Sequence, residues 1–206
     1  MDAAGTNAAK AQKEWAAWRW EDRAAVLLRA ADLLATKYRA TINAATMLGQ
    51  SKTIFQSEID AACEMIDFWR FNVQFAGEIM ADQPVNSPGM LNSTDYRGLE
   101  GFVYAVTPFN FTAIAGNVPT APVLMGGVAL WKPASTAMLS AHYILRLLTE
   151  AGLPPGAANV LFGAPAEISE ALIRAPEIRK VTFTGSTAVG QSAQEWTLPM
   201  SDTPMI

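Results

Sequence analysis

Residues 180–190 read KVTFTGSTAVG, a short apolar strand candidate that runs through a glycine turn into a helix candidate. A turn that enters a helix exposes unpaired backbone N–H groups beside the positive end of the helix dipole, where phosphate oxygens bind. Gly185 lets the backbone approach a ligand closely, and Ser186 and Thr187 add hydroxyl donors. The same turn suits a strand-to-helix junction that Ser186 caps without a ligand. The turn alone therefore leaves a phosphate site and a simple helix cap both open.

A second nucleotide-binding pattern fits this stretch less well. Gly185 and Gly190 have the spacing of a P-loop, but Gln191 stands where a P-loop has the lysine that neutralises the phosphates. The dinucleotide fingerprint GxGxxG is also absent. We therefore disfavour a P-loop.

Short apolar segments alternate with helical patterns on the amino-terminal side of this turn. Such continuously apolar segments are typical of buried parallel strands. The strand candidates are residues 102–106, 128–131, 159–162 and 180–184, and the helical patterns between them are residues 116–126, 136–151 and 166–175. This alternation predicts an α/β fold, in which right-handed crossovers place helices on both faces of a parallel Rossmann-like sheet of about four strands.

The first part of the chain has a different texture. Residues 8–80 carry helical periodicity almost throughout, and no proline precedes Pro84. Proline, glycine, asparagine and serine then crowd into residues 84–93, which indicates a loop or hairpin. We expect three parts. They are a helical segment with a loop or hairpin at 1–97, a strand-and-helix domain at 98–195, and a tail at 196–206 without clear periodicity.

Composition limits the function classes. The chain has 206 residues, of which 50% are hydrophobic and 17% charged, with a net charge of −4. These values are typical of a globular protein. No cluster of Lys and Arg supports nucleic-acid binding, and no apolar run is long enough to span a bilayer. The single cysteine excludes an internal disulfide, and the N-terminus lacks a secretory signal, so we expect a soluble intracellular protein.

Polar residues follow the strand candidates where ligands of doubly wound sheets bind. Asn110 lies between two phenylalanines after the first strand, and its amide could donate to an oxyanion or satisfy loop backbone. Lys132 ends the second strand, where it could donate to ribose hydroxyls or simply be solvated. With the glycine turn, these residues should converge on one sheet edge.

Taken together, the motifs resemble the aldehyde dehydrogenase superfamily. The set consists of TPFNF at 107–111, WKPAS at 131–135, GLPPG at 152–156 and VTFTGST at 181–187. Finer features are similar to the L-glutamate γ-semialdehyde (1-pyrroline-5-carboxylate) dehydrogenase branch. They are GQSKT at 49–53, EIDAA at 58–62, IDF at 66–68, RFN at 70–72 and NSTDYRGLEG at 92–101. The resemblance covers residues 10–190 and implies that 98–195 is a partial, truncated NAD-binding domain.

The resemblance assigns the cofactor-side residues. It implies that Thr107 takes a backbone position beside NAD and that Lys132 contacts the adenosine ribose. Ser135 stands where many relatives have a glutamate that holds the ribose, which leaves the preference for NAD over NADP open. The turn residues hold the pyrophosphate and line the adenine side; they are Gly185, Ser186, Thr187, Ala188 and Val189.

On the substrate side, the resemblance implies that Asn110 donates its amide to the oxyanion of the reaction intermediate. Phe111 matches an aromatic residue that flanks the aliphatic part of the semialdehyde, and Glu64 lies on a helix near the substrate. The implied reaction is the NAD-dependent oxidation of L-glutamate γ-semialdehyde to L-glutamate in proline catabolism. A homo-oligomer in a bacterial cytoplasm or a mitochondrial matrix is implied for the full-length protein.

The family's nucleophile and base have no counterpart in this sequence. The reaction needs a thiolate that attacks the aldehyde and a glutamate that activates water. Cys63, the only cysteine, lies in the helical segment before any strand, and the only histidine, His142, has no visible partner for a metal site. We therefore expect residues 1–206 to be inactive alone. An NAD-binding module or an interaction module without turnover remains the alternative.

Overall fold

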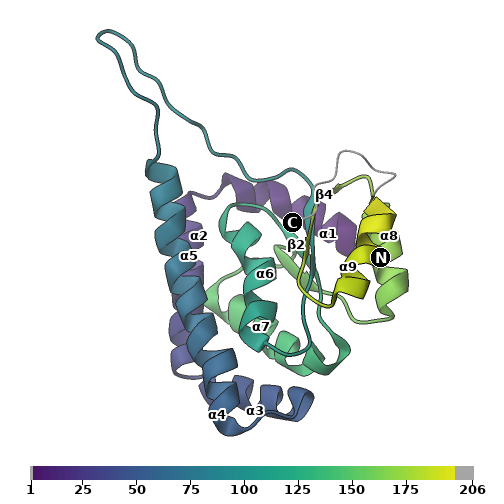
Figure 1. Cartoon of the computed structure of the whole chain (residues 1–206). Helices are drawn as coiled ribbons and strands as arrows, with labels where there is room; N and C mark the ends of the chain where they lie inside the picture. Colours follow the sequence, from purple (N-terminus) through teal and green to yellow (C-terminus); the bar gives the residue numbers. More distant parts are fainter. Residues whose placement is uncertain (1, 198–206) are drawn as a thin grey trace.

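Helices make up the first part of the molecule in this computed structural model, which describes residues 2–197 (Figure 1). The helical segment predicted at residues 8–80 is confirmed, with short breaks between its helices. Its elements are α1 (Asp2–Ala17), α2 (Trp20–Ala35), α3 (Arg39–Gln50), α4 (Ile54–Ser57), the π-helical turn η1 (Glu58–Cys63) and α5 (Glu64–Ala81). The π-helical turn was not predicted, because its i→i+5 hydrogen bonds leave no separate signature in hydrophobic periodicity.

Strands and helices then alternate as expected. The elements are β1 (Phe102–Val106), α6 (Thr112–Leu124), β2 (Ala129–Lys132), the short 3₁₀ turn η2 (Ser135–Ala137), α7 (Met138–Ala151), β3 (Ala158–Val160), α8 (Pro165–Ile173), β4 (Ile178–Phe183) and α9 (Thr187–Thr197). The expected α/β fold with a parallel sheet is therefore confirmed.

Most element boundaries differ by one or two residues from the sequence-based expectation, and those of α6 and α9 bear on the regions discussed below. Helix α6 begins at Thr112 rather than at residue 116, because the buried Thr112 hydroxyl is held by side chains of α3. Helix α9 continues through Thr197, so it includes the first two residues that we assigned to the tail. The rest of that predicted tail, residues 198–206, lies outside the described residues.

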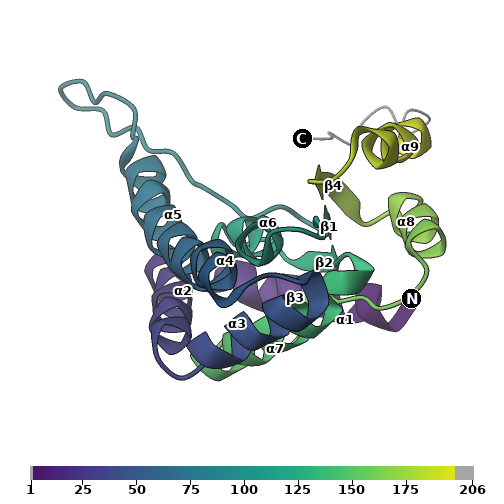
Figure 2. The ribbon, with the colours of Figure 1, turned by 60° about the horizontal axis from the view of Figure 1, so that its bottom comes forward.

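The four strands form one parallel sheet in the order β3-β2-β1-β4. Tyr104 of β1 stands opposite Leu130 of β2 on one side and Val181 of β4 on the other. The chain steps from β1 to β2 to β3 in one direction, and the connection through α8 then returns past β1 to the other edge. Right-handed crossovers therefore place α6 and α7 on one face and α8 on the opposite face. Figure 2 shows α8 and α9 standing apart from α6 and α7.

Helices α2, α3 and α5 pack onto the face that α6 and α7 cover, whereas α1 lies directly against β1, β2 and β3. Helix α5 lies along α2 and α6, and α2 and α3 contact α7 (Figure 1). Two buried tryptophans join the amino-terminal helices to α6, both by packing in the apolar core and by donating hydrogen bonds. The indole N–H of Trp69 donates to Thr120 Oγ1 at 2.9 Å, and that of Trp15 donates to Val123 O at 2.7 Å. The helical segment therefore shares one apolar core with the sheet.

A buried arginine closes the carboxyl end of α6. Arg23 of α2 is only 5% exposed, and its Nε donates to Leu124 O at 3.0 Å while Nη1 donates to Trp18 O. The last carbonyls of a helix have no partner within the helix, so the guanidinium satisfies groups that would otherwise be buried alone. Burial lowers the pKa of Arg23. Gly126, at φ +88°, lies against this guanidinium.

Between α5 and β1 the chain makes a long projecting loop (Figure 1). Its tip is a tight antiparallel turn in which the Met90 N–H donates to Ser87 O at 2.9 Å. Val85 and Leu91 are exposed on it. The loop or hairpin predicted for residues 84–93 is therefore confirmed.

The Arg23 contacts make a first prediction. Arg23→Met should lower the free energy of unfolding by about 2–3 kcal/mol, because the buried carbonyl of Leu124 and the partly buried carbonyl of Trp18 lose a charged donor. Arg29→Met, an exposed change on the same helix, is the matched control and should cost less than about 0.5 kcal/mol. Urea unfolding followed by circular dichroism measures both variants. Equal losses in the two would show that the guanidinium bonds do not stabilise this junction.

Candidate functional site

The sheet changes its direction of growth between β1 and β4, and ligands of such sheets bind outside the carboxyl ends of the strands at this point. Backbone hydrogen bonds hold the three strand ends together there. The Thr184 N–H donates to Val106 O at 3.0 Å, and the Thr107 N–H donates to Lys132 O at 3.3 Å. The structure therefore brings Thr107, Lys132 and the glycine turn to one edge.

Thr107 is buried beneath this edge. Its hydroxyl accepts a hydrogen bond from the indole N–H of Trp131 at 2.8 Å, and the residue is 3% exposed. The side chain therefore fixes a tryptophan of β2 and does not face a ligand. Local sequence carries no signal for this pair.

Lys132 is buried rather than solvated, which rules out the simpler of our two interpretations. Its side chain is 3% exposed, and Nζ donates to Pro133 O at 2.6 Å. An ammonium group has three hydrogens, and the other two meet no acceptor among residues 2–197. Burial lowers the pKa of Lys132. The site thus holds a cation with two donors available to a ligand.

The glycine turn is shaped by the ring of Phe183. A Cβ added to Gly185 would lie 2.8 Å from Phe183 Cζ, and one added to Gly190 would lie 3.1 Å from Phe183 Cε1. A side chain at Gly185 would therefore require the Phe183 ring to move, and one at Gly190 would press on the same ring, whether or not a ligand binds. Ser186 caps α9, since its Oγ accepts from the Val189 N–H at 3.5 Å. The first N–H groups of a helix have no partner within that helix. At the start of α9 these groups lie in an exposed segment, residues 185–189.

A mainly apolar groove of about 380 Å³ opens beside this turn, between α8 and α9 and above β1 and β4. Ala188 and Val189, which the family resemblance assigned to the adenine side, lie on the α9 wall. The complete lining is Tyr104, Val106, Pro165, Ala166, Ser169, Phe183, Ala188, Val189, Ser192 and Ala193. The α8 wall was not predicted, because only the crossover from β3 to β4 brings α8 to this place.

Asn110 and Phe111 form the turn between β1 and α6. Asn110 is exposed, and its amide makes no hydrogen bond to residues 2–197, so it does not serve as a loop amide that satisfies backbone. Phe111 is half-buried, and the ammonium of Lys52 lies 4.3 Å from the centre of its ring. This distance is that of a cation–π contact. Phe111 is thus held from one side by Lys52.

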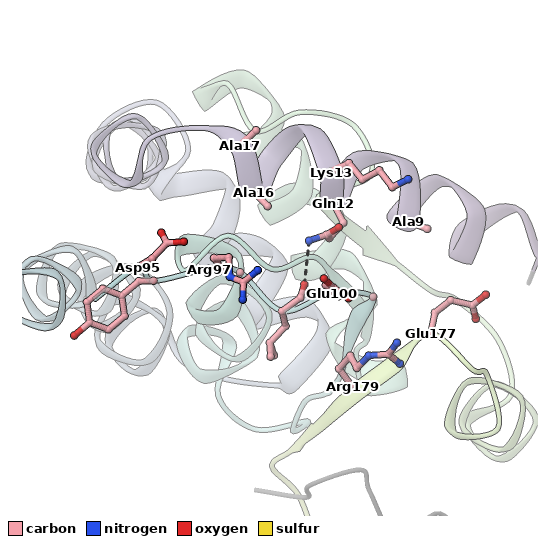
Figure 3. A pocket seen from close by; sticks show the side chains of 14 residues that line it. Ala9, Gln12, Lys13, Ala16, Ala17, Asp95, Arg97, Glu100, Glu177 and Arg179 are labelled. Atoms are coloured by element: carbon pink, nitrogen blue, oxygen red, sulfur yellow. Dashed lines mark hydrogen bonds between the residues drawn. The ribbon is translucent and has the colours of Figure 1, made fainter. Parts of the chain in front are cut away.

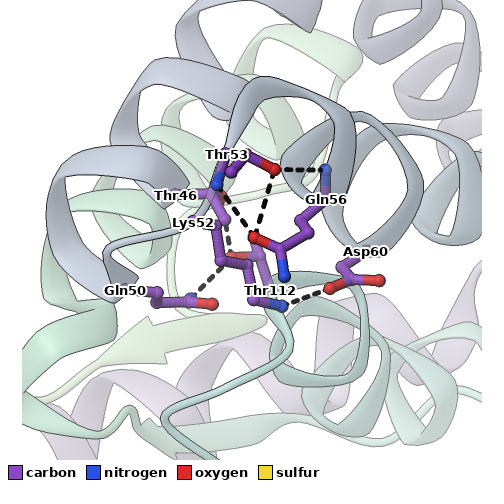
Figure 4. Close-up of polar contacts among 7 residues, drawn as sticks. All are labelled: Thr46, Gln50, Lys52, Thr53, Gln56, Asp60 and Thr112. Carbon is purple, nitrogen blue, oxygen red and sulfur yellow. Dashed lines mark hydrogen bonds and ion pairs between the residues drawn. The ribbon is translucent and has the colours of Figure 1, made fainter.

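A polar network anchors the segment that carries these two residues (Figure 4). Thr112 Oγ1 lies 2.8 Å from Thr46 Oγ1 and accepts from Gln50 Nε2 at 2.8 Å. Lys52, which is largely buried, forms an ion pair with Asp60 of η1. The linker after α3 and the π-helical turn therefore fix the start of α6, directly after Asn110 and Phe111.

Glu64 follows the π-helical turn as the first residue of α5. Its Oε2 is buried and has no partner within the described residues. Burial raises the pKa of Glu64, the nearby Asp60 carboxylate raises it further, and Lys52 opposes them. An acceptor in this state is suited to a cationic ligand group.

Ser135 and Cys63 were also considered in the sequence analysis. Ser135 is exposed at the start of η2, after β2. Cys63 is half-buried on η1, where Arg39 Nη2 lies 3.4 Å from its Sγ. Arg39 is also ion-paired with Glu58. Cys63 thus belongs to a helical ion-pair cluster, not to the strand edge.

A cavity larger than this groove lies elsewhere. It measures about 940 Å³ and is bounded by α1, residues 95–101 and the beginning of β4 (Figure 3). Gln12 crosses it and donates to Leu99 O at 3.2 Å. Its charges are of both signs, from Lys13, Arg97, Arg179, Asp95, Glu100 and Glu177. Because it adjoins the amino end of β4, we place the candidate site at the opposite edge.

Between residues 2 and 197, no three His, Cys, Asp or Glu side chains gather as a metal site. No helix within that range has both the length and the apolar character needed to cross a bilayer.

The chain matches the aldehyde dehydrogenase family over residues 1–197. A delta-1-pyrroline-5-carboxylate dehydrogenase of Agaricus bisporus is 50% identical over 193 residues, which are 93% of this chain and 35% of that protein. The mitochondrial human protein of that name is 50% identical over 179 residues, 85% of this chain and 31% of its own length. The chain thus spans about a third of these relatives.

Solved structures agree with the sequence matches. The Delta-pyrroline-5-carboxylate dehydrogenase of Mycobacterium tuberculosis bound with NAD has a TM-score of 0.96 and 48% identity, over 100% of this chain and 39% of that chain. A 1-pyrroline-5-carboxylate dehydrogenase from Thermus with bound NAD has a TM-score of 0.86 and 32% identity, over 95% of this chain and 38% of that chain.

The burial of Lys132 predicts a gain in stability when its charge is removed. At neutral pH, Lys132→Met should raise the free energy of unfolding by about 1 kcal/mol, because a desolvated ammonium is replaced by an apolar chain. The pKa of Lys132 is lowered from its ordinary 10.5, so the unfolded chain holds the proton to higher pH. As pH rises from the lowered pKa towards 10.5, the wild type therefore gains stability. The difference in free energy of unfolding between Lys132→Met and the wild type narrows over the same range.

Urea unfolding between pH 7 and pH 10.5 measures this difference. The exposed Lys10→Met on α1 is the control and should leave stability unchanged. A Lys132→Met protein that is less stable than the wild type at pH 7 would contradict the prediction.

Proposed function

This chain belongs to the aldehyde dehydrogenase family, and we propose that it forms the cofactor-binding part of an NAD-dependent dehydrogenase that oxidises L-glutamate γ-semialdehyde to L-glutamate. The substrate is proposed from relatives named delta-1-pyrroline-5-carboxylate dehydrogenase, which are about half identical to this chain. The observation that carries the cofactor is the meeting of a helix N-terminus, a buried lysine and an apolar groove at one sheet edge.

The residues present fit a dinucleotide. The turn from Gly185 into the first residues of α9 offers backbone N–H groups to a pyrophosphate. The two free hydrogens of Lys132 suit the hydroxyls of a ribose, and the groove between α8 and α9 suits a flat base. Ser135 could contact the same ribose only through its hydroxyl, which is shorter than the glutamate side chain that many relatives have at this position. Bound NAD supplies the hydride acceptor of the reaction.

The substrate end is proposed around Asn110. Its unpaired amide can donate to an oxyanion that develops on the aldehyde oxygen. Phe111, held by Lys52, offers its ring to the aliphatic chain of the semialdehyde. The buried Oε2 of Glu64 can accept from the substrate's ammonium group, which would favour the charged carboxylate.

We further propose that residues 1–206 do not complete the reaction by themselves. The chemistry needs a thiolate near the nicotinamide end of the cofactor and a base that activates water. Cys63, the only cysteine of the sequence, is held among Arg39 and Glu58 on η1. Binding of NAD without turnover, or association with other copies through exposed surface, is the alternative function of this polypeptide. A bacterial cytoplasm or a mitochondrial matrix is the proposed compartment.

Calorimetric titration tests the cofactor proposal. NAD should bind the 206-residue protein, and Lys132→Met should weaken binding about tenfold, because two charge-assisted hydrogen bonds to the ribose are lost. Lys10→Met is again the control and should bind like the wild type. Equal affinity of Lys132→Met and wild type would remove Lys132 from the site, and absence of binding in all proteins would overturn the cofactor proposal.

Turnover is tested separately. The wild-type protein given NAD and the semialdehyde should form no NADH. NADH formation that Cys63→Ser abolishes would show that this chain carries its own nucleophile.

A further inference from the structure

The groove between α8 and α9 is not uniformly apolar. Three of its lining side chains carry a hydroxyl, namely Tyr104, Ser169 and Ser192, while the others are hydrocarbon. In pockets of this kind, a few placed polar groups fix the orientation of a ligand, and the apolar walls supply most of the affinity. The hydrogen-bonding state of these hydroxyls therefore decides what the groove can recognise.

Ser192 is already satisfied within its own helix. Its Oγ donates to Ala188 O at 3.2 Å, one turn earlier in α9. It is also exposed. Its only hydrogen is therefore used, and Ser192 offers little to a ligand in the groove.

Tyr104 and Ser169 are in a different state. Their hydroxyl oxygens lie 2.7 Å apart, and either can be the donor. Two hydroxyls that share one hydrogen bond leave one hydrogen without an acceptor, and no other partner occurs among residues 2–197. Tyr104 is fully buried, whereas Ser169 is 8% exposed. Burial raises the pKa of Tyr104 to about 12, so the phenol keeps its proton at neutral pH.

The direction of the groove follows from its walls. Its lining begins at Pro165 and Ala188, in the first turns of α8 and α9. Tyr104 lies in the middle of β1, further from the glycine turn than Val106 is. A nucleotide whose phosphates bind at the turn would enter with its glycosidic bond towards the turn. The edge of a purine opposite that bond carries N1 and the 6-amino group, and it would meet Ser169 first.

We propose that Ser169, oriented by Tyr104, reads the N1 edge of the adenine base. Tyr104 donates to Ser169, and the Ser169 hydroxyl donates its own hydrogen to adenine N1. This inference rests on the proposed NAD function and deepens it, because apolar walls alone accept any flat ring of suitable size. Ser169 is then the residue that touches the base, and Tyr104 is a positioning residue.

Two dinucleotides provide the test. In nicotinamide 1,N6-ethenoadenine dinucleotide, an added ring occupies N1 and the 6-amino nitrogen, while the ribose, phosphate and nicotinamide groups are those of NAD. The wild-type protein should bind NAD roughly threefold to tenfold more tightly than this analogue, as expected for one neutral hydrogen bond. Ser169→Ala should weaken NAD binding by that factor and leave the analogue unchanged, which brings the affinity ratio close to one.

Matched variants separate recognition from packing. Ser169→Thr keeps the hydroxyl and should keep the ratio. Tyr104→Phe keeps the ring but removes the hydroxyl donor. It should lower the ratio of NAD affinity to analogue affinity to a value between that of the wild type and that of Ser169→Ala. Ser192→Ala removes a hydroxyl from the same groove and should leave the ratio at its wild-type value.

The outcomes distinguish this inference from the function on which it rests. If NAD binds and Ser169→Ala leaves the ratio at the wild-type value, the base-reading role is wrong while the cofactor proposal stands. If NAD fails to bind any of the proteins, the cofactor proposal fails and this inference falls with it.

Discussion

The sheet of this protein grows in one direction from β1 through β2 to β3, and then returns to place β4 on the other side of β1. Strand β1 is therefore hydrogen-bonded along both edges. Because crossovers are right-handed, the return also moves the chain to the other face, where α8 and α9 lie. The candidate site occupies the space at the carboxyl ends of β1 and β4. Every other feature of the site therefore depends on this reversal in the direction of sheet growth.

The charged groups with buried polar atoms differ in whether those atoms have hydrogen-bond partners. Arg23 is buried far from the strand edge, and its guanidinium satisfies the carbonyls of Trp18 and Leu124. Lys132 is buried near the site and has ammonium hydrogens without an acceptor among the described residues, and the half-buried Glu64 has a buried Oε2 without a partner there. Folded proteins satisfy most buried polar groups, because an unsatisfied one costs free energy. The unsatisfied pair therefore lies where a ligand could complete it, and the satisfied arginine stabilises the fold.

The order of elements could be predicted from local patterns. Apolar runs identified each strand to within about two residues, and the glycine turn identified the junction of β4 and α9. Local patterns failed where a distant side chain decides the outcome. Thr112 extends α6 backwards because Thr46 and Gln50 hold its hydroxyl from α3. The π-helical turn that presents Asp60 to Lys52 also has no local signature.

The sequence by itself determined the helical first part, the parallel α/β order, the family resemblance and the segments that meet at the strand ends. Periodicity and glycine placement act over a few residues, so they can be recognised without coordinates. The tertiary structure alone decided that Lys132 is buried with free donors and that Gly185 makes room for Phe183. It also joined Tyr104 to Ser169 across 65 residues of sequence. Burial and hydrogen-bond pairing depend on which distant surfaces pack together, and crossovers, not local composition, decide that packing.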